Sequence, residues 1–259
     1  MAVGLEKTQA VVIGRRGLGE SDRLVMFYSR RFGRIHGVAR AARRPRSRFG
    51  GALELFTLGE LVFFDTGKSD LLRIDHFDIV HPFSRIREDL DRFGQASWMV
   101  ECIARLTAEQ DRHRALYGLL VRGLHAVETS GGGPARAAIC FGVRAIDVLG
   151  HRPRLDACGG CQRAYPFPHA HLDFDGGGLA CAACAPAASG ALPLSAAAVR
   201  ALERLRSLSW EEAIATPYPG LEPELAGVLD AHVSRLIGEP TRTPRVLREL
   251  RRLAPGGRR

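Results

Sequence analysis

The first 80 residues alternate between short apolar runs and clusters of turn-forming residues. Each run is rich in β-branched and aromatic side chains, and Gly, Pro, Asp or Ser separates it from the next, which is typical of short strands. Because no long helical pattern lies between them, we expect the runs to form one small barrel. The expected strands are residues 8–16, 22–29, 34–41, 53–65 and 71–80.

Five short strands fit a five-stranded oligonucleotide-binding (OB) barrel, whose open face and loops suit single strands of nucleic acid. An SH3-like barrel has a similar pattern, and periodicity alone does not separate the two. The longest run, residues 53–65, fits either one bent strand or two short ones.

After residue 82 the apolar positions recur every three to four residues, as in amphipathic helices. Ser84 is expected to cap a helix that runs to about residue 110, and residues 115–128 continue in the same style. Another helix is expected over residues 135–149, ending at Gly150. The lone thiols Cys102 and Cys140 fall in these segments, where a buried thiol packs as a small apolar group.

Three further helices are expected near the C-terminus. The first begins after the Ser195 cap and the second covers residues 222–238. The third covers residues 243–253, with Thr243 as its cap and Pro244 in its first position. The predicted fold class is therefore α+β, with an OB-type nucleic-acid-binding domain over residues 1–80 and a helical domain over residues 81–259.

The positive charge of the chain is concentrated in one stretch of the predicted barrel. Residues 15–48 hold eleven arginines and two acidic residues, whereas basic and acidic residues balance elsewhere, although the whole chain carries a net charge of +9. Guanidinium groups can donate two parallel hydrogen bonds to phosphate oxygens. A disordered basic tail is the alternative, but strand-like runs flank the stretch on both sides. We therefore expect a folded surface that binds polyanions.

Pro45 has no N–H for a central strand, so residues 43–48 are expected to form a loop. An arginine-rich loop beside a barrel would contact the sugar-phosphate backbone, with little sequence preference and a steep salt dependence. Phe32 and Phe49 can either stack on bases or pack in the core. A second, weaker basic patch lies in residues 235–259, where a solvent-exposed helix face is the simpler interpretation.

Four of the six cysteines form two pairs with the spacing C-x2-C-x19-C-x2-C. This spacing and ligand set are typical of a four-cysteine zinc site, and we expect a zinc module over residues 151–186. Four cysteines leave no open position, so the single Zn²⁺ is expected to be structural, with His169 and His171 outside the site. A redox dithiol pair would need a thioredoxin-like context that the sequence lacks. The expected ligands are Cys158, Cys161, Cys181 and Cys184.

The sequence offers no set of residues for catalysis. It has no phosphate-binding loop, dinucleotide motif or nucleophile elbow. His113 and His125 are expected to be ordinary helix residues. No apolar run approaches the ~18 residues that a membrane span requires, and no signal-peptide pattern opens the chain. We therefore expect a cytoplasmic protein that is not an enzyme.

Three segments resemble the bacterial RecO family of recombination mediators. Residues 11–64, beginning VVIGRRGLGESDRLVMFYS, are the most specific, residues 148–162 and 174–184 match the zinc module, and residues 229–250 match the closing helices. The resemblance implies RecF-pathway repair of DNA damage: binding of single- and double-stranded DNA, strand annealing, and loading of RecA onto strands coated by single-strand-binding protein (SSB). It also implies RecR and the C-terminal tail of SSB as partners, an indirect role for RecA, and a location at the nucleoid.

The family's basic DNA-binding surface can be placed on this sequence residue by residue. Most of its lysines are arginines here, and some members of the family lack the zinc cysteines. The DNA-binding residues that the resemblance implies are Arg15, Arg16, Arg34, Arg40, Arg43, Arg44, Arg46 and Arg48.

Two other functions fit parts of the pattern. A zinc-containing RNA-binding or ribosome-associated module would use the same barrel and basic loop. A nuclease or helicase accessory protein is the other, but it would need a carboxylate cluster for divalent metal ions or a phosphate-binding loop.

Overall fold

The computed structural model describes residues 4–67, 71–130, 133–185 and 190–253. It divides into two compact units, one formed by Met1–Thr129 with Arg242–Arg259 and the other by Ser130–Thr241. The expected barrel segment lies in the first unit and the expected zinc module in the second. The domain boundaries at residues 80 and 151–186 stay predictions, and Pro186 itself lies outside the described residues.

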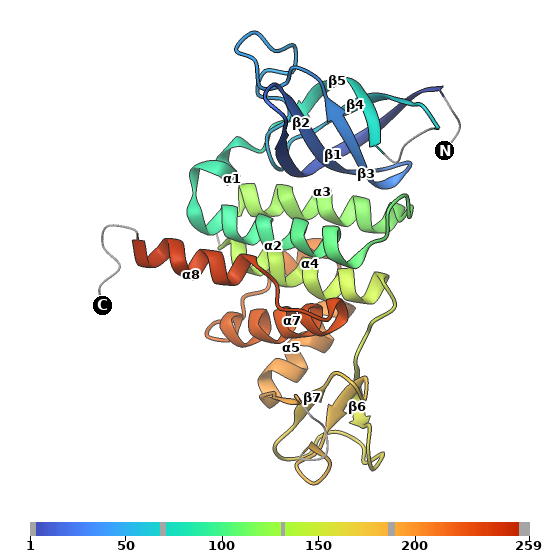
Figure 1. Cartoon of the computed structure of the whole chain (residues 1–259). Helices are drawn as coiled ribbons and strands as arrows, with labels where there is room; N and C mark the ends of the chain where they lie inside the picture. Colours follow the sequence, from blue (N-terminus) through green and yellow to red (C-terminus); the bar gives the residue numbers. More distant parts are fainter. Residues whose placement is uncertain (1–3, 68–70, 131–132, 186–189, 254–259) are drawn as a thin grey trace. The chain divides into compact units, whose positions relative to one another are not determined.

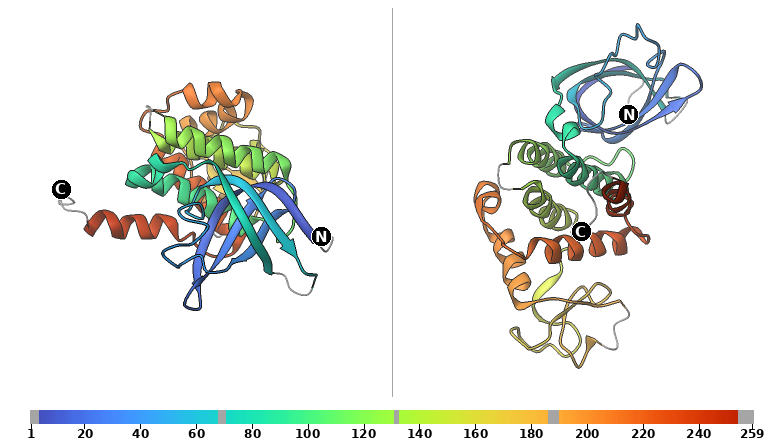
Figure 2. Two further views of the ribbon diagram at one scale, coloured as in Figure 1. Left: turned by 90° about the horizontal axis from the view of Figure 1, so that it is seen from above. Right: turned by 90° about the vertical axis from the view of Figure 1, so that its left-hand side faces the viewer.

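Five strands close into a barrel in the first unit (Figures 1 and 2). They are β1 (Gly4–Leu18), β2 (Asp22–Ser29), β3 (Gly33–Ala39), β4 (Leu58–Asp65) and β5 (Leu71–His81). Their order is β1-β2-β3-β5-β4, with β3 and β5 parallel and the other neighbouring pairs antiparallel. This closed Greek-key arrangement confirms the OB-type barrel.

Alternating side chains build the barrel core. Along β3 every second residue is buried, which is the period of a strand with one face in a core. Phe27 from β2 packs against Phe77 from β5, with ring centroids 5.3 Å apart. Other buried members of this core include Val12, Val25, Ile35, Leu61, Phe63, Leu72 and Ile74.

The expected strand over residues 53–65 is wrong in its first part, because β4 begins only at Leu58. Leu53 and Phe56 are buried, as their apolar character suggested. Their backbone, however, forms turns, and Phe56 has a φ of 73° that no strand allows. These side chains therefore enter the core from a loop, where a strand pattern cannot distinguish them.

The first unit also contains α1 (Ser84–Glu88), α2 (Leu90–Leu106), α3 (Arg114–Thr129) and α8 (Thr243–Leu253). The single helix expected from Ser84 is wrong: Asp89 is extended and separates α1 from α2. Ser84 is not the cap either, because it is the first helical residue and Phe83 precedes it without a side-chain capping bond. The Asp89 carboxylate accepts a hydrogen bond from the Arg92 N–H at 2.8 Å and so caps α2.

Helix α8 covers the expected residues, but Thr243 is its first helical residue and not its cap, since the Val246 N–H already donates to the Arg242 carbonyl. Another residue helps to satisfy the free N–H groups. The Glu101 carboxylate, from α2, accepts hydrogen bonds from the backbone N–H groups of Arg242 and Thr243 at 2.7 and 2.9 Å. It also accepts the Thr243 hydroxyl at 2.6 Å. A carboxylate at this end of the helix is favourable because the helix dipole is positive there.

The second unit contains α4 (Pro134–Val148), α5 (Ala196–Ser207), α6 (Trp210–Ala215) and α7 (Glu222–Ile237). Ser195 caps α5 by accepting the Ala198 N–H, as predicted. Helix α6 was not predicted, although Ser209 and Glu212 form a capping box whose S-x-x-E signal is visible in the sequence. None of the helices in the described part of the chain is long and apolar enough to cross a bilayer.

A small sheet follows α4, with strand order β6-β8-β7-β9. Its strands are β6 (Arg154–Cys158), β7 (His171–Asp173), β8 (Gly178–Ala180) and β9 (Leu192–Pro193). Strands β7 and β8 form an antiparallel pair, and Leu172 and Leu179 on them are buried. The cysteine pairs thus lie on a short β framework.

A buried histidine makes the second unit sensitive to acid. His232, on α7, is 8% exposed, and burial lowers its pKa to about 4. The unfolded chain, with a histidine pKa near 6.5, binds this proton first as the pH falls, so unfolding is favoured between pH 6.5 and 4. The histidine should cost about 2 kcal/mol of stability between pH 7 and pH 5.

Urea unfolding of a Trp98→Phe chain, followed by the fluorescence of Trp210, measures this loss. His232→Gln removes the titrating group, so we expect the pH 7 to pH 5 difference to shrink by about 2 kcal/mol. An equal pH dependence with and without His232 would contradict this prediction.

Candidate nucleic-acid interface and metal centre

The connection from β3 to β4 is a folded ridge, which we call the arginine loop (residues 40–57). Successive i to i+3 backbone hydrogen bonds turn it, for example Arg44 N–H to Ala41 at 3.2 Å and Ser47 N–H to Arg44 at 3.0 Å. Phe49 and Leu53 are 3% and 1% exposed and belong to the barrel core. Burying a side chain of this size contributes about 2 kcal/mol, so the loop is anchored.

The exposed side chains between these anchors are basic. Turn residues that lie between buried apolar side chains are usually polar and exposed. The arginines of this kind that face solvent are Arg40, Arg43, Arg44, Arg46 and Arg48. The expectation that residues 43–48 form a loop is confirmed. A disordered basic tail, the alternative, does not fit these anchored turns.

The arginine loop is bonded to the turn between β1 and β2. The Asp22 carboxylate accepts the Ala41 N–H at 2.8 Å, and this hydrogen bond is the main cause of the lowered pKa of Asp22. The Arg43 N–H donates to the Ser21 carbonyl at 2.9 Å, and its guanidinium donates to the Gly19 carbonyl at 2.9 Å. These bonds fix the loop at one end of the barrel.

Strand register brings further arginines to the same end. Arg16 on β1 lies opposite Leu24 on β2, and Leu24 lies opposite Val38, two residues before Arg40. Arg73 on β5 lies opposite Val38 on the other side and is exposed. Arg73 was missed from the sequence because it lies outside the basic stretch and only the parallel β3–β5 pair places it here.

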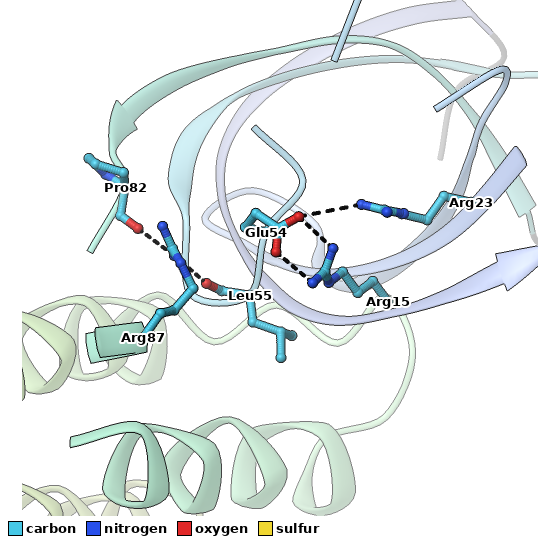
Figure 3. A network of polar contacts seen from close by, with 6 residues as sticks. All are labelled: Arg15, Arg23, Glu54, Leu55, Pro82 and Arg87. Atoms are coloured by element: carbon cyan, nitrogen blue, oxygen red, sulfur yellow. Dashed lines mark hydrogen bonds and ion pairs between the residues drawn. The ribbon is translucent and has the colours of Figure 1, made fainter. Parts of the chain in front are cut away.

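Arg15 has an internal partner. Its guanidinium contacts the Glu54 carboxylate in two places, at 2.6 and 2.5 Å, and Arg23 lies 3.7 Å from the same carboxylate (Figure 3). In the same figure the Arg87 guanidinium, from α1, donates to the Leu55 carbonyl at 2.8 Å and to the Pro82 carbonyl at 2.7 Å. Glu54 therefore neutralises part of the charge of Arg15, and Arg87 holds the end of the arginine loop.

Arg34 lies apart from the other seven arginines of the expected set. It is the second residue of β3, about 13 Å along the strand from Val38, given 3.3 Å per residue. Its backbone carbonyl accepts the Gln110 N–H at 2.9 Å, and its side chain is half-buried beside the α2–α3 connection. The preceding Gly33, with a φ of 64°, leaves no room for a Cβ against the Asp111 carbonyl.

Six of the expected arginines keep their charge available. Among the described residues, none of these six guanidinium groups lies within 4.0 Å of a carboxylate oxygen. Such a surface attracts a polyanion because no carboxylate contacts these groups, although Asp22 lies near enough to Arg40 and Arg44, and Asp75 to Arg48, to interact with them electrostatically. The six are Arg16, Arg40, Arg43, Arg44, Arg46 and Arg48.

Beside Arg16 the outer face of β1, β2 and β3 is hollowed into a groove of about 450 Å³. Leu24, Met26 and Leu71 give it apolar walls. His36, on β3, contacts the Glu109 carboxylate at its rim, with Nδ1 and Oε1 2.5 Å apart. Arg15 and Arg16 line this groove, so it adjoins the basic end of the barrel and extends along the outer face of the strands.

The two aromatic candidates for base stacking pack against the protein. Phe49 is 3% exposed, with the Arg48 guanidinium 5.1 Å from its ring centroid. Phe32 is half-buried and meets Phe63 edge-on, with centroids 5.5 Å apart. The core interpretation that the sequence left open therefore describes both residues.

The four cysteines of the C-x2-C pairs come together in the second unit. Their Sγ atoms all lie within 4.8 Å of one another, and those of Cys161 and Cys181 are 3.8 Å apart. Neither His169 nor His171 belongs to this group. In the first turn a Cβ on Gly160 would lie 2.9 Å from the Cys184 Sγ, so this position requires glycine. Four cysteine sulfurs this close together can hold a metal ion.

Backbone N–H groups surround the cluster. The Cys181 N–H points at the Cys158 sulfur at 3.3 Å. Burial raises the pKa of Cys158, but backbone N–H groups of Cys161, Cys181 and Gly160 together lower it to about 6. Hydrogen bonding with Cys158 and Cys181 raises the pKa of Cys184 to about 12. All four cysteines can be deprotonated this close together only when a cation lies between them.

The remaining cysteines, Cys102 and Cys140, are both buried, and burial raises the pKa of Cys140 to about 11.

The C-terminal basic patch is only partly described. Helix α8 exposes Arg245 and Arg248, whereas Arg258 and Arg259 lie outside the described residues. Arg245 pairs with Glu249 at 3.8 Å, one helical turn away.

Comparison with known proteins covers both units. The family model for the N-terminal part of recombination protein O matches residues 1–83, and that for its C-terminal part matches residues 87–245. The DNA repair protein RecO of Anaeromyxobacter sp. (strain K) is 35% identical over 94% of this chain and 96% of its own length. That of Geobacter sulfurreducens is 34% identical over 88% of this chain and 93% of its own length. The chain belongs to the RecO family of recombination proteins.

Proposed function

We propose that this protein is a DNA-binding mediator of recombination in RecF-pathway DNA repair. It binds single- and double-stranded DNA through the arginine loop and the adjoining end of the barrel, and it anneals complementary strands. The observation that carries the proposal is the row of exposed arginines without carboxylate partners on an OB-type barrel. The family match supports a role in recombination and repair.

Annealing requires that two phosphate backbones approach each other while their base edges stay free. Arginines that contact phosphates reduce the repulsion between the two strands without covering the Watson–Crick edges. The anchored loop holds several such groups at fixed positions, which lowers the entropy cost of binding. In this mechanism Arg15 shares its charge with Glu54, and Arg34 contributes from the other end of β3. The main phosphate contacts come from Arg16, Arg40, Arg43, Arg44, Arg46 and Arg48.

We assign the metal centre to one structural Zn²⁺ held by Cys158, Cys161, Cys181 and Cys184. Four thiolates match tetrahedral zinc and leave no position for a substrate, so the ion would stabilise the fold of the module without chemistry. The proposal gives the protein a binding role and no reaction. RecR and the SSB tail as partners, RecA loading and a cytoplasmic site at the nucleoid rest on the family resemblance alone.

The salt dependence of DNA binding tests the proposal. If six arginines each contact a phosphate, the logarithm of the affinity for single-stranded DNA should fall with the logarithm of salt concentration with a slope of about −4. Fluorescence anisotropy with a labelled oligonucleotide measures it. A competitor RNA of the same sequence separates the two candidate functions: tighter binding of RNA than of DNA would support the RNA-binding alternative, and a slope near zero would contradict both.

A further inference from the structure

A second cluster of metal-ligand side chains lies in the first unit, outside the four-cysteine centre. His81 is the last residue of β5, and His125 and Glu128 lie on α3. Residues three apart on a helix point to the same side, so the helix presents an imidazole and a carboxylate together. One nitrogen or oxygen from each residue lies within 4.8 Å of those of the other two.

The contacts within this cluster are short. His81 Nε2 and Glu128 Oε2 are 2.6 Å apart. The rings of His81 and His125 have centroids 4.9 Å apart, and Phe83 packs edge-on against both, at 4.4 and 4.7 Å. Glu128 is 7% exposed, His81 is half-buried and His125 is exposed. The cluster therefore has an apolar wall and one side open to solvent.

A hydrogen-bonded pair of His81 and Glu128 explains two of the three positions but not His125. The Arg92 guanidinium, the nearby cation, donates to the backbone carbonyl of Glu128 and leaves its carboxylate to the histidines. Two imidazoles and one carboxylate are a ligand set that Zn²⁺ takes with a fourth position left to water. Imidazole also suits other divalent transition metals, whereas Mg²⁺ and Ca²⁺ prefer oxygen ligands.

We propose that His81, His125 and Glu128 form a second metal site, which binds a divalent transition-metal ion of the Zn²⁺ class. The ion takes the place of the proton between His81 Nε2 and Glu128 Oε2: a neutral imidazole carries its proton on Nδ1 instead, and an imidazolium releases one proton to solvent. Ligands at about 2.0–2.1 Å in a tetrahedral site lie roughly 3.3 Å from one another, so His81 and Glu128 need to separate by less than about 1 Å. The bound ion would link the end of β5 to α3.

The number of Zn²⁺ ions per chain tests this site. The full chain is dialysed against micromolar Zn²⁺, and bound zinc is measured by mass spectrometry of the metal. We expect His125→Ala to bind one equivalent less than the unmodified chain. Glu128→Gln keeps a hydrogen-bonding partner for His81 and should also lose one equivalent. His113→Ala, which removes a histidine outside the cluster, is the matched control and should lose none.

Co²⁺ distinguishes the two centres. Cobalt bound to cysteine thiolates has an intense sulfur-to-metal charge-transfer band, whereas cobalt bound to nitrogen and oxygen has only weak visible bands. His125→Ala should remove the weak component and leave the charge-transfer band. Equal zinc content in the unmodified chain and in His125→Ala would overturn the proposal, and so would loss of the charge-transfer band in that variant. Neither result depends on DNA binding, so the proposed function is tested separately.

Discussion

Changing Arg43, Arg44, Arg46 and Arg48 together to glutamate is expected to abolish DNA binding at physiological salt and to slow strand annealing at least a hundredfold. In the proposed function each of these exposed guanidinium groups contacts one phosphate. Each glutamate would remove that contact and repel the phosphate. A set of four glutamines isolates the lost contacts. That variant should flatten the salt slope for single-stranded DNA by about 3, because each phosphate contact contributes about 0.7.

The fold should survive these changes because Phe49 and Leu53 anchor the loop and the backbone bonds of Ala41 and Arg43 to the β1–β2 turn remain. The substitutions remove two side-chain hydrogen bonds, from Arg43 to the Gly19 carbonyl at 2.9 Å and from Arg48 to the Ile74 carbonyl at 3.4 Å. A melting temperature within a few degrees of that of the unmodified chain would confirm that the fold is intact. The matched control changes four exposed arginines of the second unit to glutamate and so reverses their charge. They are Arg152, Arg163, Arg200 and Arg204. It changes net charge equally and should retain most of the affinity. If both sets weaken binding equally, net charge and not the arginine loop controls it.

The barrel was predictable because strand periodicity is a local property. Residues 22–29 match β2 at both ends: Val25 and Phe27 belong to the barrel core, and turn-forming residues bound the apolar run. Leu53 and Phe56 were assigned to a strand because a side chain can be buried without its backbone joining a sheet. The break at Asp89 was missed because the spacing of apolar positions in the sequence continues from Ile86 to Leu90. In the structure Leu90 is exposed, and the extended backbone of Asp89 and its bond to the Arg92 N–H mark a new helix.

The candidate interface was predictable in its charge and less so in its geometry. The density of arginines is visible along the chain, but Glu54, the partner of Arg15, is 39 residues away from it in sequence. The position of Arg34 beside Gln110 depends on how α2 and α3 connect, which no local pattern encodes. Charge counts therefore predict a polyanion-binding surface, and strand register decides which groups share it.

The two metal clusters differ in the same way. The spacing of the two C-x2-C pairs is typical of one kind of site, a four-cysteine metal centre. The sequence alone therefore predicted that the four cysteines lie close together. His81 is 47 residues from Glu128 and 44 from His125, and each is ordinary in its own segment. Sequence reasoning treated His125 as a plain helix residue because its partner on β5 cannot be identified without the fold.

Cys158→Ser is expected to release the Zn²⁺ that we propose for the four-cysteine centre and to unfold the module around β6, β7 and β8. The short strands bury few large side chains, Leu155, Leu172 and Leu179, so bound metal should supply much of the stability of the module. Zinc bound by such a set contributes on the order of 10 kcal/mol, so its loss should cost more than the module's own stability. Hydrogen exchange of the β7–β8 amides should rise to the rate of an unfolded chain.

Cys140→Ser is the matched control, because Cys140 is a buried thiol of the same unit that lies outside the metal cluster. It should destabilise α4 modestly and leave zinc content and exchange at β7–β8 unchanged. Since the arginine loop belongs to the other unit, Cys158→Ser should retain DNA affinity within about threefold. Protected β7–β8 amides in the zinc-free variant would show that the module folds without metal, whereas a large loss of DNA affinity would move part of the interface into the module.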